Sequence, residues 1–383
     1  PTLSIARLPV NNIEQIEIYR DKAEKYQESF LVDEEKNGWQ TLLTFVSDDE
    51  SGGSGSNTEL IWHLKPTEDI IRTQIPSKFN ISKIYLHDYD KVPGGLGRWK
   101  PKATDDLINQ INRGTLMINY FGHGDPDTWA HESVLNRSRD LPKFQNEYRL
   151  PVWVAATCTW GKFDNPSRPS MSEELMWLSQ KGGISVISAS RPVYVNGNTK
   201  FTTDFYRHLF HNSSNFVPSR LAGDAFLMAS GYTHNYQKFH LYGDPTLNLA
   251  DPEYYVEILS VQPENSNTDT LRALSTVVVT ARVTTLSGTP LDNFEGTAVL
   301  QVFDATDKKF VENGSYRINY EYSGGTIFKG LVTVSSGAMT GRFIVPKSII
   351  YEPVPSGGLS IYASSQTQGD AVGYQDSLVL YGS

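Results

Sequence analysis

Short apolar runs alternate with amphipathic stretches through the first 250 residues. Apolar residues recur at helical spacing from Ile13 to Tyr26, and two further stretches of this kind end at a glycine. The pattern predicts helices over residues 13–29, 103–114, 171–183 and 198–211. It predicts buried strands over residues 3–8, 40–49, 83–89, 115–124, 152–158 and 184–190.

Strands that alternate with helices favour the α/β class, a mostly parallel sheet with helices on both faces. In such sheets the chemistry gathers at the carboxyl ends of the strands. We therefore expect a functional site in the loops that follow Tyr120, Thr157 and Ser188.

The pattern changes near Asp251 and Pro252, where helical periodicity ends. Short strands separated by Gly- and Pro-containing turns follow, and they predict an all-β immunoglobulin-like sandwich. We expect strands over residues 275–285, 286–291, 295–304, 326–337, 339–346 and 358–364. The chain should thus hold two domains, residues 1–250 and 251–383. The Ser- and Gly-rich residues 51–57 are a predicted loop.

Composition narrows the possible functions. The 383 residues carry a formal net charge of −9 and no basic stripe, so nucleic acid is not an expected partner. A single cysteine excludes an internal disulfide framework and a multi-cysteine zinc site. The sequence contains no run of about 18 apolar residues, so it predicts no membrane-spanning helix. Because the sequence starts at Pro1, without Met or a signal-like stretch, we expect a fragment or a processed form.

The single cysteine, Cys158, lies where the apolar run "VWVAAT" stops, and His123 follows "LMINYF" in the same way. If the two strands are neighbours, the thiol and the imidazole meet at one sheet edge. A nearby imidazole favours the reactive thiolate and can later protonate a leaving amine. The amides of Gly124 and Cys158 are candidates for an oxyanion hole. The alternatives are a small buried cysteine and a simple turn at "GHG".

The segments "INYFGHGDPDTWAHE", "VAATCTWGKFDNPSRPSMSEELMW" and "FHLYGDPTLNLADP" resemble the gingipain family of cysteine peptidases, in the caspase-like clan. The resemblance covers about residues 1–250 and implies a caspase-like sheet. It implies that Cys158 is the nucleophile and His123 the general base and acid. Gingipains add an acidic residue that orients the histidine, and by the resemblance that position falls before Pro1.

Other segments, among them "FDNPSRPSMSEEL", "GGISVISASRPVYVNGN" and "PLDNFEGTAVLQVFD", are similar to the sortase branch of this family, which serves type IX secretion. That similarity implies a bacterial cell-surface location, on the extracellular side of the outer membrane. It implies substrates that carry a C-terminal sorting domain, a possible lipopolysaccharide acceptor, and outer-membrane secretion partners. No cofactor is implied.

Further residues near these motifs have two interpretations each. Trp160, Tyr194 and Arg191 are candidates for the substrate cleft, with plain packing or a surface ion pair as the alternatives. His131 and Glu132 either support the dyad or cap a helix. Turn formation or solvation is favoured for Asp125, Asp127 and Asp244. His234 and His240 are expected to be structural. The acidic run Asp48, Asp49, Glu50 offers calcium-compatible oxygens, although a solvated loop is favoured.

Three functions remain open at this point. The first is a sortase that forms an acyl-enzyme, and the second is a secreted endopeptidase of gingipain type. The third is a catalytically silent surface scaffold. The sandwich carries no visible chemistry, so we expect it to brace the catalytic domain or to dock a partner.

Overall fold

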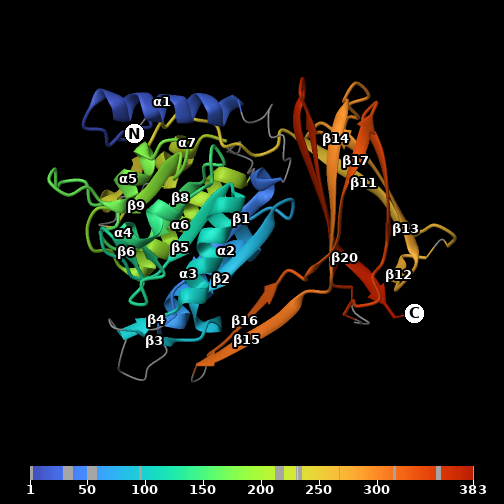
Figure 1. Ribbon diagram of the computed structural model, residues 1–383, viewed down its shortest axis with the longest axis horizontal. Helices are drawn as coiled ribbons and strands as arrows, with labels where there is room; N and C mark the ends of the chain where they lie inside the picture. Colours follow the sequence, from blue (N-terminus) through green and yellow to red (C-terminus); the bar gives the residue numbers. More distant parts are fainter. Residues whose placement is uncertain are drawn as a thin grey trace.

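The computed structural model describes residues 3–28, 38–49, 58–94, 97–211, 220–229, 231, 235–266, 268–313, 316–350 and 355–382. Two parts are visible in Figure 1, which we call the α/β region (residues 3–250) and the β region (residues 251–382). Each has a hydrophobic core of its own. Residues 51–57, predicted as a loop, lie outside the described residues.

A six-stranded sheet forms the centre of the α/β region, in the order β10-β9-β8-β5-β1-β2. The strands from β9 to β2 are parallel, and β10 runs antiparallel at one edge. Their bounds are β1 Leu42–Ser47, β2 Asn80–Tyr85, β5 Met117–Phe121, β8 Val152–Ala156, β9 Ser185–Ala189 and β10 Phe239–Tyr242. Strands β5, β8 and β9 are buried along their whole length, and β1 is buried except at its first residue. This burial is expected for a parallel sheet that is covered on both faces.

Helices cover both faces of this sheet. Helix α2 packs against α6, and α7 packs against α6, while α1 packs against α5. The strand order, with the right-handed connections usual between parallel strands, puts α2 on one face and α3 and α5 on the other. The bounds are α1 Ile13–Glu28, α2 Thr58–Gln74, α3 Pro101–Arg113, α4 Arg137–Asp140, α5 Met171–Trp177, α6 Val195–Phe210 and α7 Ala222–Ala229. The predicted α/β class, with a mostly parallel sheet flanked by helices, is confirmed.

Short elements complete the α/β region. Two short strand pairs lie among the loops: β3 Val92–Gly94 with β4 Gly97–Trp99, and β6 Thr128–Trp129 with β7 Leu135–Asn136. The 3-10 turns are η1 Trp39–Thr41, η2 Leu86–Asp88, η3 Leu141–Lys143 and η4 Tyr236–Lys238.

The β region is built from ten strands. Eight of them form a sheet in the order β11-β13-β18-β17-β14-β19-β20-β12, and a further pairing of β11 with β20 closes the sheet around its core. The remaining two, β15 and β16, form a separate hairpin. The bounds are β11 Tyr254–Pro263, β12 Thr270–Arg272, β13 Thr276–Thr284, β14 Gly296–Phe303, β15 Asp307–Asn313, β16 Tyr316–Tyr322, β17 Thr326–Ser335, β18 Ala338–Ile344, β19 Gly357–Ser365 and β20 Gly369–Tyr381.

Some expectations about single elements are wrong. Residues 3–8 are not a strand: Arg7 makes one isolated bridge to Tyr242, and Leu3 and Ile5 are exposed. The strand expected over residues 83–89 starts earlier, at Asn80, and gives way to η2. Residues 286–291 form a turn that carries one bridge, between Thr284 and Pro290. Helices α2 and α7 and the hairpin β15–β16 were not predicted at all.

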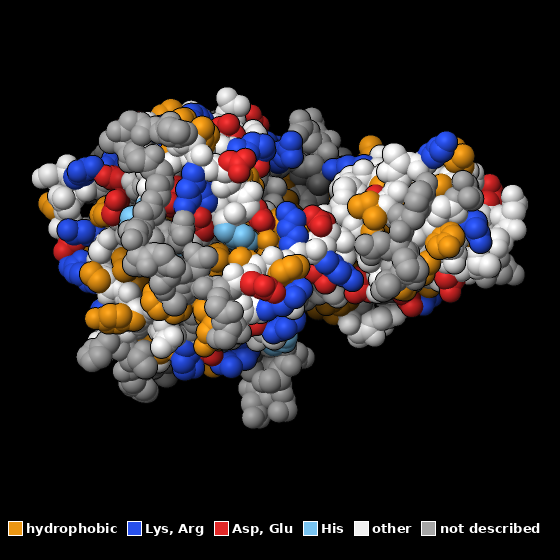
Figure 2. Space-filling view, turned by 90° about the horizontal axis from the view of Figure 1, so that it is seen from below, with side chains coloured by type: hydrophobic (Ala, Val, Ile, Leu, Met, Phe, Trp, Pro, Cys, Tyr) orange, Lys and Arg blue, Asp and Glu red, His pale blue; other side chains and the backbone are white. Residues whose placement is uncertain are grey.

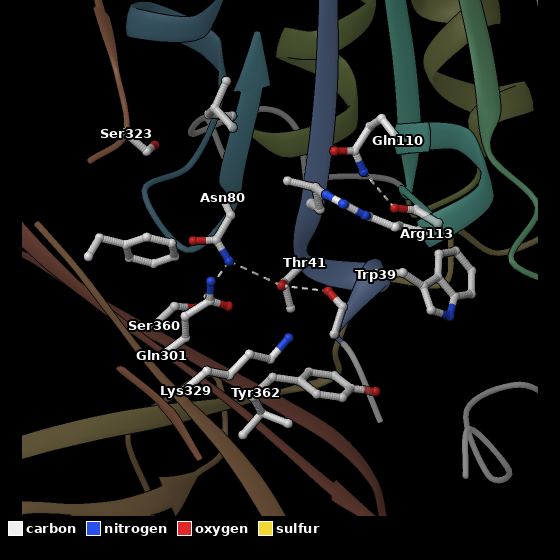
Figure 3. Close-up of a pocket in the computed structure, with 16 residues that line it drawn as sticks. Trp39, Thr41, Asn80, Gln110, Arg113, Gln301, Ser323, Lys329, Ser360 and Tyr362 are labelled. Atoms are coloured by element: carbon white, nitrogen blue, oxygen red, sulfur yellow. Dashed lines mark hydrogen bonds between the residues drawn. The ribbon is translucent and has the colours of Figure 1, made fainter. Parts of the chain in front are cut away.

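The β region lies along β2, which is an edge strand of the α/β sheet. At the amino end of β2, the Asn80 side-chain amide donates to Ser360 Oγ at 3.1 Å. A cavity of about 350 Å³ lies beside this bond, with Arg113 on one wall and Lys329 on the other (Figure 3). The connection between the regions is fixed at Asp251, which pairs with Lys78 and Arg220 at 3.0 and 2.9 Å.

At the carboxyl end of β2, the hairpin β15–β16 reaches back under the α/β region (Figure 1). It forms a small apolar cluster with α2 and with the last residue of β2, made of Leu60, Leu64, Tyr85, Ile318 and Tyr320. None of the described helices is long and apolar enough to cross a membrane.

Candidate active site

Strands β5 and β8 are parallel neighbours, and their register pairs Phe121 with Ala156. His123 and Cys158 each lie two residues beyond this pair, so the chain brings both to the same edge of the sheet. Both residues are half-buried. This placement is the one that the two apolar runs predict for a thiol and an imidazole acting together.

Gly124 brings the two loops into direct contact. A Cβ atom at Gly124 would lie 2.6 Å from Thr157 Oγ1 and 3.1 Å from its methyl group, so no larger residue fits without movement. Thr157 is buried and directly precedes Cys158. Gly124 also forms a bridge to Trp129, whose two hydrogen bonds use the amides of Asp125 and Ala130. The amide of Gly124 is therefore left outside this ladder and is placed beside the cysteine loop.

The cysteine lies against the loop after β9. Its Sγ lies 3.4 Å from the amide nitrogen of Val193 and 3.6 Å from the carbonyl oxygen of the same residue. The next residue, Thr159, has a φ of 49°, in the left-handed region that side chains rarely adopt. A sharp turn after β8 therefore presents the thiol at the end of the strand.

Trp160 is not part of a substrate cleft. Its side chain is fully buried and packs against Trp129 and Trp153, with ring centroids 5.0 and 6.0 Å apart. Trp160 therefore belongs to the core beneath the cysteine loop, which is the packing alternative.

An acidic residue next to His123 comes from the end of β1. Asp48 Oδ2 accepts the backbone N–H of His123 at 2.9 Å, and the Tyr120 hydroxyl donates to the carbonyl of His123 at 2.7 Å. A Cβ atom at Gly122 would lie 2.5 Å from the Cβ of Asp48, so this glycine permits the close approach. The acidic residue that the resemblance places before Pro1 stays a prediction. Asp48 is a different contact, made to the backbone of His123, and it arises because β1 and β5 are parallel neighbours.

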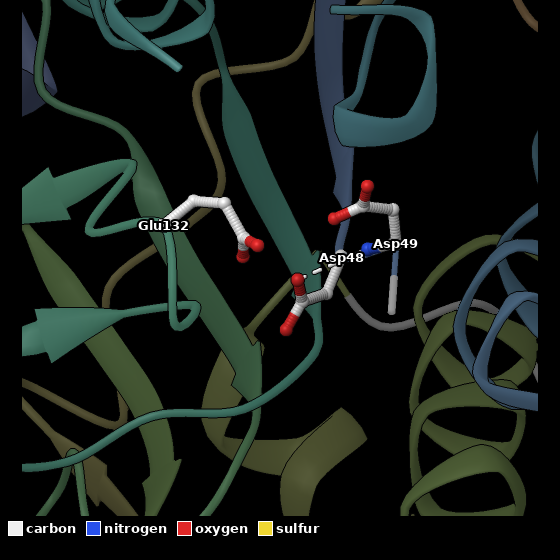
Figure 4. Close-up of side chains that lie close together, drawn as sticks. All are labelled: Asp48, Asp49 and Glu132. Carbon is white, nitrogen blue, oxygen red and sulfur yellow. Dashed lines mark hydrogen bonds between the residues drawn. The ribbon is translucent and has the colours of Figure 1, made fainter. Parts of the chain in front are cut away.

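Asp48 belongs to a buried acidic cluster with Asp49 and Glu132, whose carboxylate oxygens lie within 4.8 Å of one another (Figure 4). The buried Lys100 ammonium donates to Asp49 Oδ2 at 2.6 Å and also to the carbonyl of Leu86. The Lys91 ammonium lies 3.9 Å from the same Asp49 oxygen, so a buried and a more exposed lysine face three buried carboxyl groups.

The pKa values of two of these carboxyl groups move upward. Burial raises the pKa of Asp48 to about 7, and the charges of Glu132 and Asp49 act in the same direction, while its bond to the His123 amide and the His123 charge oppose the rise. Burial, helped by Asp49, also raises the pKa of Glu132. Asp48 therefore keeps its proton up to near neutral pH.

Two further histidines surround His123. The His63 ring on α2 meets the His123 ring edge to face, with centroids 5.4 Å apart and an interplanar angle of 89°. The His131 ring lies 4.8 Å from His123 on the other side. Burial, and to a lesser extent the neighbouring His123 and His131, lowers the pKa of His63 to about 3. His63 is therefore a neutral imidazole beside the candidate base.

Asp48 and Asp49 of the predicted acidic run lie with Glu132 in a group of carboxylates that could hold a metal ion. Lys100 already donates to Asp49, so the described residues favour the ion pair with this lysine over a calcium ion. Glu50 lies outside the described residues.

The remaining candidates lie around the cysteine loop and in turns. Arg191 pairs with Asp164 at 2.6 Å, both exposed, which is the surface ion pair rather than a free cation. Tyr194 is 77% exposed at the start of α6. Asp125 and Asp244 accept backbone N–H groups two residues ahead, as turn residues do. Asp127 pairs with Arg137 and Arg168.

His240, one of the two histidines expected to be structural, does not join the site. His240 is half-buried and bonds the Ser190 hydroxyl at 2.9 Å, in keeping with a structural role. His234 lies outside the described residues. Figure 2 shows the molecule from the lower side of Figure 1, where β3, β4 and the hairpin β15–β16 lie. In this view histidine side chains, coloured pale blue, reach the surface near the middle of the α/β region.

Two members of this site could have been predicted. Asp48 follows an apolar parallel strand as His123 and Cys158 do, so the rule of carboxyl strand ends applied to it equally. Glu132 was named as a possible support of the dyad. His63 and Lys100 carry no local signal, because their roles depend on helices packed from elsewhere in the chain.

The fold and the paired loops define an α/β cysteine peptidase. A model of peptidase family C25 matches residues 1–250, and the chain belongs to that family. The gingipain resemblance is thereby confirmed at the level of the family. No curated protein sequence matches the chain.

The solved structures that match this chain share little sequence with it. The Arg-specific cysteine proteinase gingipain R (RgpB) is 17% identical with a TM-score of 0.49, over 99% of this chain and 75% of that one. The complex of the pro- and mature domains of Porphyromonas gingivalis RgpB is 16% identical with a TM-score of 0.47, over 100% of this chain and 77% of that one. Dimeric latent PorU from Porphyromonas gingivalis is 23% identical with a TM-score of 0.32, over 53% of this chain and 20% of that one. The chain thus matches about a fifth of that PorU chain.

Proposed function

We propose that this chain is the catalytic part of a PorU-like sortase, which removes the C-terminal sorting domain from cargo of type IX secretion. The observation that carries the proposal is the matched position of His123 and Cys158 beyond neighbouring strands, with Gly124 held against Thr157. The sortase-like segments, such as "FDNPSRPSMSEEL", select this branch of the C25 family over a simple endopeptidase.

The first half of the reaction forms an acyl-enzyme. His123 removes the proton from Cys158 Sγ, and the thiolate attacks the carbonyl carbon of the scissile peptide bond. The oxygen of the tetrahedral intermediate accepts hydrogen bonds from the amides of Gly124 and Cys158, each worth roughly 3 kcal/mol in such sites. When the C–N bond breaks, His123 returns the proton to the leaving amine of the sorting domain.

The second half releases the cargo from the thioester. His123 takes a proton from the incoming nucleophile, which attacks the thioester carbonyl and expels the Cys158 thiolate. Water gives a free carboxylate, and an amine of an anionic lipopolysaccharide gives an amide. The exposed Tyr194 contributes a wall of the cleft for one of these groups.

Asp48 supports this chemistry through the backbone. Its carboxylate accepts the His123 amide, and the Tyr120 hydroxyl fixes the His123 carbonyl, so both peptide groups of the histidine are fixed. The proposed location is the extracellular side of the outer membrane, with secretion partners of the type IX system. The β region braces the α/β region along β2.

The test is Cys158→Ala in the full-length protein, assayed for cargo that retains its sorting domain. We expect uncleaved cargo in the variant and cleaved cargo in the wild type. Mass spectrometry of the wild-type product with an added amine then separates the two second half-reactions. An amine-capped carboxyl end supports the sortase, whereas a free carboxylate at every amine concentration contradicts it and leaves a hydrolytic peptidase.

A further inference from the structure

The hairpin β15–β16 belongs to the β region but lies at the sheet edge that carries the candidate active site. Its partner there is the end of β2: Tyr85 is the register partner of Ser47, the residue before Asp48. The rings of Tyr320 and Tyr322 lie 5.7 and 6.0 Å from the Tyr85 ring. The hairpin therefore packs one strand away from the acidic residue beside His123.

Polar contacts hold the hairpin at the turn η2. The hydroxyl of Tyr320 donates to Asp88 Oδ1 at 3.0 Å, and that of Tyr322 donates to Asp88 Oδ2 at 2.6 Å. His87 Nε2 lies 2.8 Å from the Tyr320 hydroxyl. Both oxygens of one carboxylate thus engage the hairpin, and η2 is fixed from the β region.

The same turn supplies the next contact toward the site. The carbonyl of Leu86, in η2, accepts a hydrogen bond from the Lys100 ammonium, which also pairs with Asp49. The Asp49 amide donates to Asp48 Oδ1 at 3.0 Å, and Asp48 accepts the His123 amide. An unbroken series of contacts therefore runs from the hairpin to the backbone of His123.

A second series runs through α2. Leu60 and Leu64 pack in the apolar cluster with Ile318 and Tyr320 of the hairpin. His63 lies between those two leucines in sequence, is 4% exposed, and meets the His123 ring at 5.4 Å. Its Nδ1 has no hydrogen-bond partner among the described residues. Packing of α2 against the hairpin therefore sets where the His63 ring meets His123.

We propose that the hairpin β15–β16 is a positioning element for the candidate general base, acting through η2 and Lys100 on the backbone of His123 and through α2 and His63 on its ring. The proposal rests on the proposed role of His123. Tyr320, Tyr322 and His63 are positioning residues in this account, because none of them is placed to touch the substrate.

The experiment removes the hydroxyl hydrogen bonds of Tyr320 and Tyr322 to Asp88 and keeps both aromatic rings. The double variant Tyr320→Phe/Tyr322→Phe is compared with Tyr316→Phe, a matched control on the same hairpin whose ring is 56% exposed. The readout is the rate of Cys158 alkylation by iodoacetamide from pH 5 to 9 in the full-length protein. His123→Ala defines the part of the rate that depends on the imidazole.

The titratable groups around His123 are His63 on α2, Asp48 and Asp49 after β1, and His131 and Glu132 between β6 and β7. Lys100 and Lys91 face Asp49, with their ammonium nitrogens 2.6 and 3.9 Å from its Oδ2. We expect the double variant to lose at least about fivefold of the His123-dependent rate near pH 7, against the 10²–10⁴-fold that such a base supplies. We also expect its pH midpoint to move, while Tyr316→Phe keeps the wild-type profile.

A pH profile of the double variant that coincides with the wild type overturns the hairpin proposal and leaves the dyad intact. A wild-type rate that does not depend on His123 overturns the dyad, and the hairpin proposal with it. Because the double variant can also lower stability, His63→Phe, which keeps a buried aromatic ring, provides the second arm. A midpoint unchanged in His63→Phe contradicts the route through α2.

Discussion

The two sides of the candidate active site are built in different ways. Cys158 follows β8, its sulfur contacts the backbone of Val193, and beneath it lies the apolar core around Trp160. His123 instead lies among buried charges, with Asp48 bonded to its amide and Lys100 behind. The sheet alone places the nucleophile. The base depends on groups that come from three other elements and, through the hairpin, from the β region.

This difference predicts that changes on the cysteine side affect chemistry, whereas changes on the histidine side affect stability and pH dependence as well. Removal of an ion from a buried cluster leaves uncompensated charge, which costs far more than removal of a thiol.

Cys158→Ala should lower peptidase activity on the order of 10⁶-fold, as loss of a nucleophile does in comparable enzymes. Its free energy of unfolding should change by less than about 1 kcal/mol, because the sulfur makes only long, weak hydrogen bonds within the described structure. Cleavage of cargo and guanidinium unfolding measure the two quantities. Retained activity would show that another residue is the nucleophile.

Lys100→Met should lower the free energy of unfolding by roughly 3–5 kcal/mol, because the carboxyl groups of the cluster lose their buried cation. Lys102→Met is the matched control on α3: its side chain is 72% exposed and pairs with Asp106 one turn along. That control should cost no more than about 0.5 kcal/mol. Equal effects of the two substitutions would contradict a buried, charge-dependent histidine side.

Asp48→Asn should change how stability depends on pH. Unfolded Asp48 loses its proton near pH 3.8 and the folded protein keeps it to about pH 7, so wild-type stability is lost as pH rises through this window. Relative to the wild type, the variant should gain up to roughly 4 kcal/mol between pH 4 and pH 7. Urea unfolding across that range measures the difference.

The control for this prediction is Asp125→Asn, at an exposed turn in the loop after His123. We expect its stability difference from the wild type to stay flat over the same range. A difference for Asp48→Asn that is equally flat would mean that Asp48 ionises in the folded protein as it does in water.

Gly124→Ala should cost roughly 1–3 kcal/mol of stability and lower activity, because the new Cβ would lie 2.6 Å from Thr157 Oγ1. Thr157→Ala in the same chain opens that space, so the double variant should recover most of the loss. A double-mutant cycle of unfolding energies measures the coupling. Additive effects would show that the two loops are not in contact.

The positions of Cys158 and His123 were predictable because their signals are local. Cys158 and His123 each end an apolar run, and adjacency of two strands was enough to bring them together. Trp160 was misplaced because a buried and a cleft-lining tryptophan have the same sequence signature. Trp160 is buried because it packs against Trp129 and Trp153, which come from other segments of the chain.

The groups that surround His123 were not predictable, and the reason is physical. They depend on α2, whose helical pattern is broken by Pro66, and on a hairpin whose strands are rich in Lys, Glu and Tyr. Neither has a continuous apolar face. They are stabilised by each other, through the cluster of Leu60, Leu64, Ile318 and Tyr320. Asp48 was within reach of the strand-end rule, but the resemblance directed attention to a position before Pro1.

The most direct measurement is a crystal structure of the full-length protein after reaction with a peptidyl chloromethyl ketone. The account predicts a thioether on Cys158 Sγ, the ketone oxygen within hydrogen-bond distance of the Gly124 and Cys158 amides, and the His123 ring next to the sulfur. An adduct on another residue, or a ketone oxygen directed away from both amides with His123 remote, would contradict it.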